Sequence, residues 1–444
     1  MKGEAFLPVL LAALAPILVL TLSVAGIGAI KWQPPMIWSA QIGNATESDT
    51  NGVWTASLDS TGLYVGGFAD AWRFAGNGLP PTSPGNAFAS RYDLAGHQIW
   101  TRSFGDPRIF NIRSIAAGND SFYMVGSSFV KKYDSSGNEV WTDSFVSSAD
   151  DIGSADGVSV GSDGVYATGT HYFSSNASQR VELHAYDFQG KMLWTTVIGG
   201  GSAGASIVPS NVYAGPNGVY VSVYPHGNSP ASLSRYNFNG TQVWTRQLGC
   251  PCYPTALSGD ETGTYVAGGM PASTPATSAF VSKYDWTGGQ LWTRLNIISC
   301  ICLKITMSAS SSGVDLAIAE TNQGLLIKFD PSGNRVWSFT IPWLPYSIAA
   351  GENGLYVGGD FTFFRDAFLA EFTQSSSLIF FGINPPFSFL LLSGLIGGPI
   401  IGVFVWLRRQ RASRLRPAST APRYGSTNVP ADVCPVCKDR FRHY

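Results

Sequence analysis

Charged side chains and catalytic signatures are both scarce in this sequence. Asp, Glu, Lys and Arg make up only 13% of its 444 residues, whereas hydrophobic residues make up 45% and glycine contributes 50. This composition argues against an all-helical protein and favours strands and turns around a large core. The chain has no nucleophile elbow, HExxH motif, phosphate-binding loop or dinucleotide-binding glycine motif, and its five histidines are scattered. The sequence therefore offers no catalytic residue, and we expect a protein without enzymatic activity.

Two stretches near the ends of the chain lack charge altogether. Residues 5–30 and 386–407 are uncharged, and each can span a bilayer, which takes about 20 apolar residues. Five arginines in 408–416 follow the second stretch and are expected to stay in the cytoplasm. For the first stretch we favour an uncleaved signal anchor, with a cleaved signal peptide as the alternative.

These stretches predict the domain organisation of a cell-membrane protein. We expect an anchor or signal peptide (1–31), an extracytoplasmic domain (32–382), a transmembrane helix (383–407) and a flexible cytoplasmic tail (408–444). The tail is basic, with nine Lys or Arg against two Asp or Glu, so the remainder is mildly acidic. We expect the membrane, and no nucleic acid, as a partner.

One hairpin motif recurs six times in the predicted ectodomain. In each copy an aromatic residue, usually Tyr, lies eight residues before a Trp and four residues before a Gly. The copies are RYDLAGHQIWT (91–101), KKYDSSGNEVWT (131–142), AYDFQGKMLWT (185–195), RYNFNGTQVWT (235–245), KYDWTGGQLWT (283–293) and KFDPSGNRVWS (328–338). Such regularity indicates a structural repeat.

The segment before each hairpin predicts two further strands joined by a tight polar turn, as in SIAAGNDSFYMVG. Each unit thus has four strands, which we name A, B, C and D in chain order. The repeated Trp residues are about 47 residues apart on average, and a four-stranded unit of this period is typical of a β-propeller blade. Seven A–B pairs, the first at 53–67 and the last at 347–359, predict an all-β, seven-bladed β-propeller flanked by the two transmembrane helices.

The last blade lacks an obvious D strand, and two segments compete for that place. One is IWSAQIG (37–43), which contains Trp38, and the other is LIFFG (378–382), with Phe380 in the Trp register. We favour the Trp38 segment, because closure of the ring by the opposite end of the chain removes open sheet edges.

These motifs resemble a bacterial-type β-propeller repeat described by YVTG, FVAKYD and GNxLWT-like elements. The clearest copies are FVKKYDSSGNEVWT and FVSKYDWTGGQLWT, and the resemblance covers about residues 37–382, with a more distant likeness to pyrroloquinoline-quinone-type propellers. Asn237 and Phe329 depart from the pattern, as does a degraded seventh copy, EFTQSSSLIFF. The resemblance implies the fold more firmly than an activity.

The connections between strands differ in length on the two faces of such a propeller. The A–B and C–D turns, which form what we call the short-turn face, are uniform. The B–C and D–A connections form the opposite, variable face and include 68–88, 170–182, 197–210 and 360–368. The repeated Tyr and Trp are expected to pack between blades. Binding residues are expected on the variable face, because loops on a rigid scaffold commonly carry function.

Cysteines fall in two places. Cys250, Cys252, Cys300 and Cys302 lie in D–A connections of adjacent blades, where an oxidising compartment favours disulfides in any of three pairings. A thiolate metal site and free thiols are the alternatives. In the tail, Cys434, Cys437 and His443 form a partial zinc site that lacks a fourth ligand, with a reduced, disordered tail or a redox pair as the alternatives. Zinc in the tail is the one cofactor indicated.

Two sets of polar residues complete the candidate sites. Four sequons predict N-glycosylation at Asn44, Asn119, Asn176 and Asn239. Six aspartates on the variable face are expected to be solvated loop charges, with an acid/base pair or a calcium site as alternatives: Asp70, Asp150, Asp151, Asp156, Asp360 and Asp366.

The sequence as a whole predicts a membrane-anchored binding or cell-surface scaffold module. Its B–C and D–A loops would contact a protein or carbohydrate. The alternative is a propeller enzyme, a hydrolase or a quinone-dependent oxidoreductase, with its site at the top of the central channel.

Overall fold

The computed structural model describes most of the predicted ectodomain. The described residues are 34–373, with the exception of 43–50, 70–85, 105–111, 119, 127, 146–150, 152, 176–177, 203–206, 226–229, 271–276, 301–303, 352–353 and 361–366. Among them no helix is long and apolar enough to cross a membrane. The two predicted membrane spans and the tail lie outside the described residues.

The described chain consists of β-strands that form seven separate antiparallel sheets. The first three sheets in chain order contain β2 (Asn51–Asp59), β3 (Gly62–Ala69), β4 (Asn86–Tyr92) and β5 (Gln98–Phe104); β6 (Ile112–Gly118), β7 (Ser121–Gly126), β8 (Phe129–Asp134) and β9 (Glu139–Ser144); and β10 (Ser154–Val160), β11 (Val165–Phe173), β12 (Ser178–Tyr186) and β13 (Met192–Ser202).

The next three contain β14 (Ile207–Gly215), β15 (Gly218–Pro225), β16 (Ser232–Tyr236) and β17 (Gln242–Gln247); β18 (Tyr253–Asp260), β19 (Gly263–Met270), β20 (Thr277–Tyr284) and β21 (Gln290–Arg294), with the short β22 (Ser299–Cys300) paired to β20; and β23 (Lys304–Ser310), β24 (Gly313–Ala319), β25 (Gly324–Phe329) and β26 (Arg335–Ile341). The seventh combines β27 (Leu344–Ala350), β28 (Gly354–Asp360) and β29 (Ala367–Thr373) with β1 (Met36–Ile42). We number these blades 1 to 7.

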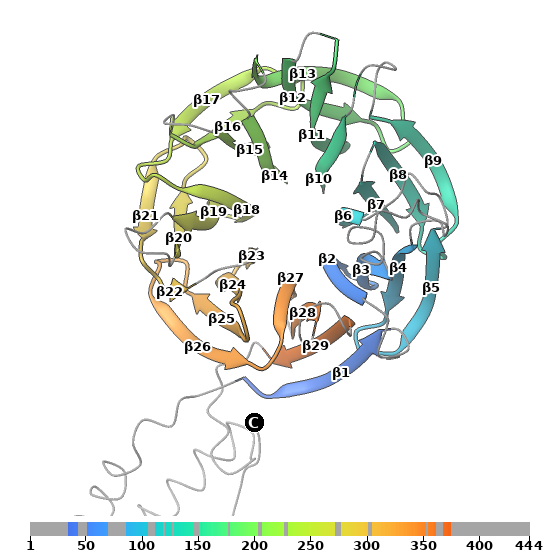
Figure 1. Cartoon of the computed structure of the whole chain (residues 1–444), viewed down its shortest axis with the longest axis vertical. Coiled ribbons are helices and arrows are strands. Elements are labelled where there is room, and N and C mark those ends of the chain that lie inside the picture. Colours follow the sequence, from blue (N-terminus) through green and yellow to red (C-terminus); the bar gives the residue numbers. More distant parts are fainter. Residues whose placement is uncertain are drawn as a thin grey trace, which may run out of the picture. The chain divides into compact units, whose positions relative to one another are not determined.

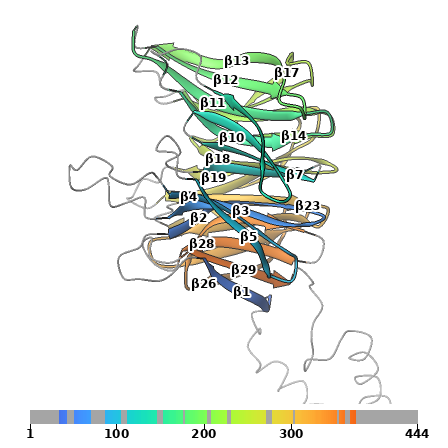
Figure 2. The ribbon, with the colours of Figure 1, turned by 90° about the vertical axis from the view of Figure 1, so that its right-hand side faces the viewer.

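The blades form a closed ring around a central axis (Figure 1). Figure 2 views this ring from the side, with the strands running across its thickness from one face to the other. The seven-bladed, four-stranded propeller predicted from the repeat is thus confirmed. Buried apolar side chains fill the space between neighbouring sheets, so that each core cluster combines residues of adjacent blades.

Blade 7 is closed by the N-terminal strand. β1 pairs antiparallel with β29, and Trp38 lies opposite Glu371. This confirms the prediction that the Trp38 segment supplies the last D strand; the competing segment, 378–382, lies outside the described residues. Since β1 also gives blade 7 its outer edge, closure ties the two ends of the propeller together.

The repeated Trp and Gly hold neighbouring blades together. In five pairs of blades, the indole Nε1 of one blade donates a hydrogen bond to a carbonyl in the C–D turn of the next, as Trp194 does to Phe238 at 2.8 Å. The turn glycine, such as Gly240 with φ 85°, lies flat against the same indole ring. A side chain at this glycine would be strained by its backbone conformation and would strike the ring. The hairpin motif therefore provides a contact between neighbouring blades, made by the Trp of one blade and the C–D turn of the next, which we call the interblade clasp. This contact confirms the structural interpretation of the motif.

A second recurring feature is a β-bulge near the start of strand A. The A–B register shifts by one residue in six blades, as between Val53 and Thr55 in blade 1, and only blade 6 pairs without a shift. The bulge brings strand A close to a glycine of strand B: a Cβ on Gly67 would collide with the carbonyl oxygen of Gly52. The second glycine of the YVGG element is thus required for close approach of two backbones.

Candidate functional site

The bulges place one extra residue per blade near the variable-face end of the central channel. Strand A begins at this face, so the unpaired bulge residues form a ring around the channel mouth. The ring contains Trp54, Arg113, Asp156, Ser210, Thr255 and Tyr346, and in blade 6 we assign the first residue of β23, Lys304, to it. Unlike the repeated Trp and Gly of the interblade clasp, these residues differ in chemistry from blade to blade.

On one side of the circle of bulge residues, Lys304 contacts two aromatic residues. Its Nζ lies 4.9 Å from the centre of the Trp54 ring and 5.9 Å from that of Tyr346, and it donates to the Trp54 carbonyl at 3.0 Å. The two rings are stacked at 5.5 Å. Desolvation of the ammonium group lowers the pKa of Lys304 to about 8. On the other side of the ring, Arg113 forms an ion pair with Asp156.

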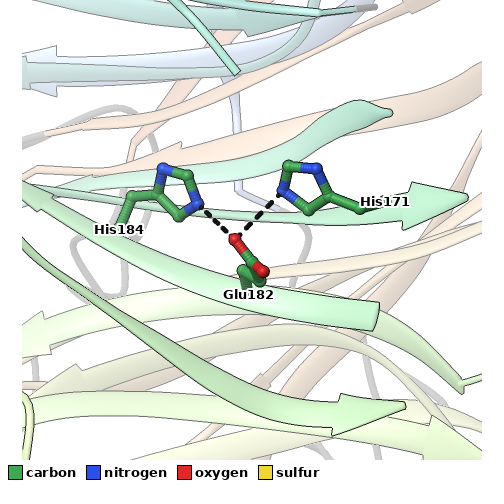
Figure 3. A group of neighbouring side chains, drawn as sticks. All are labelled: His171, Glu182 and His184. Carbon is green, nitrogen blue, oxygen red and sulfur yellow. Dashed lines mark hydrogen bonds and ion pairs between the residues drawn. The ribbon is translucent and has the colours of Figure 1, made fainter. Parts of the chain in front are cut away.

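A second polar cluster lies between blades 2 and 3 and contains His171, Glu182 and His184 (Figure 3). His171 is near the end of β11, and the other two residues share one side of β12. Glu182 Oε2 is 3.4 Å from His171 Nε2 and 3.0 Å from His184 Nε2. The three side chains are only 2%, 10% and 6% exposed, respectively. The cluster is therefore almost inaccessible to solvent.

Neighbouring groups fix these side chains in place. Asp151 Oδ2 lies 2.7 Å from His171 Nδ1, and Tyr186 Oη lies 3.3 Å from His184 Nδ1. The Phe145 ring stacks on both imidazoles, with centroids 4.7 Å and 4.4 Å away. Phe145 and Asp151 belong to the connection between blades 2 and 3, so this site depends on two blades.

The residues of this cluster were not predicted from the sequence. The five histidines are scattered along the chain, but two of them, His171 and His184, converge in the structure. Glu182 and His184 are two residues apart on a predicted strand, a spacing that puts both on one side of a sheet. That spacing was the available signal, but the third member, His171, follows only once the B–C register is known.

The predicted solvated aspartates are also corrected where the structure describes them. The side chains of Asp151 and Asp360 are buried, and Asp156 is 14% exposed beside Arg113. A charged carboxylate is rarely buried without partners, and the pairing with His171 or Arg113 explains the burial of Asp151 and Asp156. Asp70, Asp150 and Asp366 lie outside the described residues.

Of the predicted cysteine sites, the structure joins Cys250 to Cys252 in a disulfide. This is the pairing within one CxC motif. Cys252 is buried against blades 4 and 5, whereas Cys300 lies in β22 and Cys302 lies outside the described residues. Among the sequons, Asn239 is exposed in a C–D turn and accepts a hydrogen bond from the Thr241 hydroxyl at 2.9 Å. The remaining predicted sites lie outside the described residues: Asn44, Asn119, Asn176, Cys434, Cys437 and His443.

We expect peptide mapping without reduction to find Cys250 and Cys252 linked within one peptide, its mass lowered by about 2 Da relative to the reduced peptide. Because so short a loop restricts the unfolded chain little, reduction should lower the free energy of unfolding only slightly. A peptide that joins Cys250 or Cys252 to Cys300 or Cys302 would contradict this pairing.

No protein-family model and no curated protein sequence matches the chain. Similar solved structures include BamB from Moraxella catarrhalis, at 12% identity and TM-score 0.42 over 78% of this chain and 99% of that chain. The Pan2 WD40 domain from Neurospora crassa is 9% identical, with TM-score 0.49 over 77% and 96%. BBS1N, solved in complex with ARL6DN, is 12% identical, with TM-score 0.46 over 79% and 95%. These are propeller likenesses at low identity, so the fold assignment rests on the chain's own strand pairing, and the repeat family remains a resemblance.

Proposed function

We propose that this chain is a membrane-anchored, extracytoplasmic binding or scaffold module that contacts a protein or carbohydrate through its variable face. The observation that carries this proposal is the chemical difference between the two faces. On the short-turn face, six C–D turns repeat one arrangement, in which an Asp or Asn side chain accepts backbone N–H bonds. Residues with no counterpart in other blades gather near the variable face.

The position of the chain ends supports this orientation. Met36 lies opposite Phe372, and the Thr373 N–H donates to the Pro35 carbonyl at 3.2 Å. Both described ends are thus side by side at the short-turn face. With predicted membrane spans at both ends, the short-turn face is the one nearer the bilayer, and the variable face is available to a partner.

An aromatic pair offers a contact surface on the variable face. Tyr253 is 38% exposed at the start of β18, directly after the Cys250–Cys252 loop. It packs edge-on against Tyr224, with ring centroids 4.5 Å apart. Tyrosine suits such a surface, because it combines a rigid apolar ring with a polar hydroxyl and is enriched at binding hot spots.

We expect a photo-crosslinking amino acid at Tyr253 of the full chain to give a covalent adduct of higher mass in intact cells. The same substitution at Ser136, exposed in a C–D turn of the short-turn face, is the matched control and should give none. Adducts from both positions in equal amount, or from Ser136 alone, would contradict the assignment of the binding face.

The alternative function, a propeller enzyme, has one observation in its favour. With its pKa lowered to about 8, Lys304 is closer to a reactive neutral amine than an ordinary lysine and lies at the channel mouth, near Trp54 and Tyr346. The crosslinking experiment also separates the two functions. An enzyme with a small substrate would give no macromolecular adduct from either position.

A further inference from the structure

In the cluster of His171, Glu182 and His184, the Nε2 atoms of both imidazoles point toward Glu182 Oε2 (Figure 3). These three potential metal-ligand atoms all lie within 4.8 Å of one another. The other oxygen, Oε1, is 3.3 Å from the Arg180 guanidinium. Oε2 is therefore the oxygen that faces the imidazoles.

Hydrogen bonding sets the tautomer of His171. A carboxylate accepts hydrogen bonds, so the contact of Asp151 Oδ2 with Nδ1 places the ring proton on Nδ1. A neutral His171 then turns an unprotonated Nε2 toward Glu182 Oε2 at 3.4 Å. Two lone pairs face each other there, which is unfavourable unless a cation lies between them. This Nε2 makes no hydrogen bond within the described part of the chain.

Neighbouring groups also orient His184. The Tyr186 hydroxyl hydrogen-bonds to Asp143, and its oxygen lies 3.3 Å from His184 Nδ1. His184 Nε2 is hydrogen-bonded to Glu182 Oε2 at 3.0 Å, and a metal ion between these two atoms would take the place of that proton. An outer carboxylate or hydroxyl that orients a histidine in this way is the usual second layer of a metal site.

We propose that His171, Glu182 and His184 bind a divalent transition-metal cation, with Zn²⁺ as the best-matched ion. Two imidazole nitrogens and one carboxylate oxygen are a common zinc ligand set, and they leave a fourth position for water or a partner's ligand. In a tetrahedral zinc site, neighbouring ligand atoms lie about 3.3 Å apart. The two distances to Glu182 Oε2, 3.0 and 3.4 Å, already match this spacing.

The environment also favours a preformed site. Stacking on Phe145 fixes both imidazole planes, and Arg180 fixes the carboxylate. Little conformational freedom is then lost when the ion binds.

The test measures zinc binding to the purified full chain with Cys434→Ser and Cys437→Ser, which remove the competing tail thiols. After chelation and dialysis against Zn²⁺, we expect about one ion more per chain than in the same protein carrying Glu182→Gln or His184→Asn. Asp151→Asn should weaken zinc binding by about 10- to 100-fold, because it removes the orienting carboxylate.

His97→Asn is the matched control. His97 also pairs with an aspartate, at 2.9 Å from Asp93, but it is 80% exposed in a C–D turn and should not affect zinc binding. Substitution with Co²⁺ should give visible bands without the intense thiolate absorption of a cysteine site. Thermal unfolding without metal shows whether each variant is folded.

Equal zinc content in folded Glu182→Gln, His184→Asn and control proteins would overturn the proposal. It would also be overturned by a chain that binds no zinc at neutral pH, with nitrogen NMR showing both imidazoles doubly protonated. In that case two protons, in place of a metal ion, would balance the buried carboxylates.

Discussion

Replacement of Trp194 by alanine is expected to lower the free energy of unfolding by about 3 kcal/mol, the lower end of the range for truncation of a packed aromatic ring. The indole donates to the Phe238 carbonyl at 2.8 Å and lies against Gly240, both in the next blade. Its loss removes the clasp between blades 3 and 4 and leaves a cavity beside Tyr166, whose ring centroid is 5.9 Å away. Chemical denaturation followed by fluorescence would measure the change.

Trp194→Phe provides the control, because it keeps an aromatic ring but removes the N–H donor. Its cost should be about 1 kcal/mol, the worth of one hydrogen bond, plus a small packing loss. If Trp194→Ala costs no more than Trp194→Phe, the ring contributes little, and the interpretation of the repeat as an interblade clasp is wrong.

Asp260→Asn is expected to destabilise the protein by about 3 to 5 kcal/mol at neutral pH, because it leaves a buried ammonium without its counter-ion. Asp260 and Lys283 are 3% and 2% exposed, and their oxygen and nitrogen are 2.9 Å apart. The carboxylate also accepts from Thr262 and Tyr265. Urea denaturation at pH 7 would give the difference between variant and wild type.

The pH dependence of this difference has a definite sign. Burial raises the pKa of Asp260, but the hydrogen bonds from Tyr265, Lys283 and Thr262 outweigh it and lower the pKa below 3.8. A carboxyl group whose pKa is lower in the folded state stabilises the protein above its unfolded pKa, and this stabilisation is lost as the pH falls through the folded pKa. The cost of Asp260→Asn should therefore be constant above about pH 5 and shrink below pH 4.

Two controls separate the charge effect from the turn. Asp59 accepts the same hydrogen bonds from its turn, from the Thr61 and Gly62 N–H groups, and forms no ion pair with a lysine in the described part of the chain, so Asp59→Asn should cost less than about 1 kcal/mol. Asp260→Asn combined with Lys283→Met should be less harmful than Asp260→Asn alone. An equal loss for Asp59→Asn and Asp260→Asn would show that the buried ion pair is unimportant.

The architecture was predictable because every blade repeats it. The spacing of Tyr, Gly and Trp encodes a hairpin, a left-handed turn residue and a clasp, and each of these is local in sequence or connects equivalent positions. Closure of blade 7 by β1 was predictable because an open sheet edge is unfavourable. No knowledge of side-chain packing was needed for either step.

The candidate sites were less predictable, because they depend on register and on contacts between blades. His171 and His184 come together only when β11 and β12 pair with Gly169 opposite Glu182. Asp151 joins them from the preceding connection. The bulges of strand A likewise leave Trp54 and Tyr346 at unpaired positions, where both rings contact Lys304. Hydrophobic alternation alone does not reveal such an extra residue in a strand.

Repeated residues and blade-specific residues have different roles in the propeller. Repeated residues hold the blades together, whereas residues specific to one blade, such as His171, Glu182 and His184 or those at the channel mouth, form the proposed binding sites near the variable face. Substitutions in the first group should affect mainly stability. Substitutions in the second should affect mainly binding.

Anomalous diffraction at the zinc edge from crystals of the zinc-loaded protein tests this account most directly. We predict one peak between blades 2 and 3, at about 2.0 to 2.2 Å from Nε2 of His171, Nε2 of His184 and a carboxylate oxygen of Glu182. An ordered, seven-bladed ring with no peak at this position, and with His171 Nε2 directed away from Glu182, would contradict it.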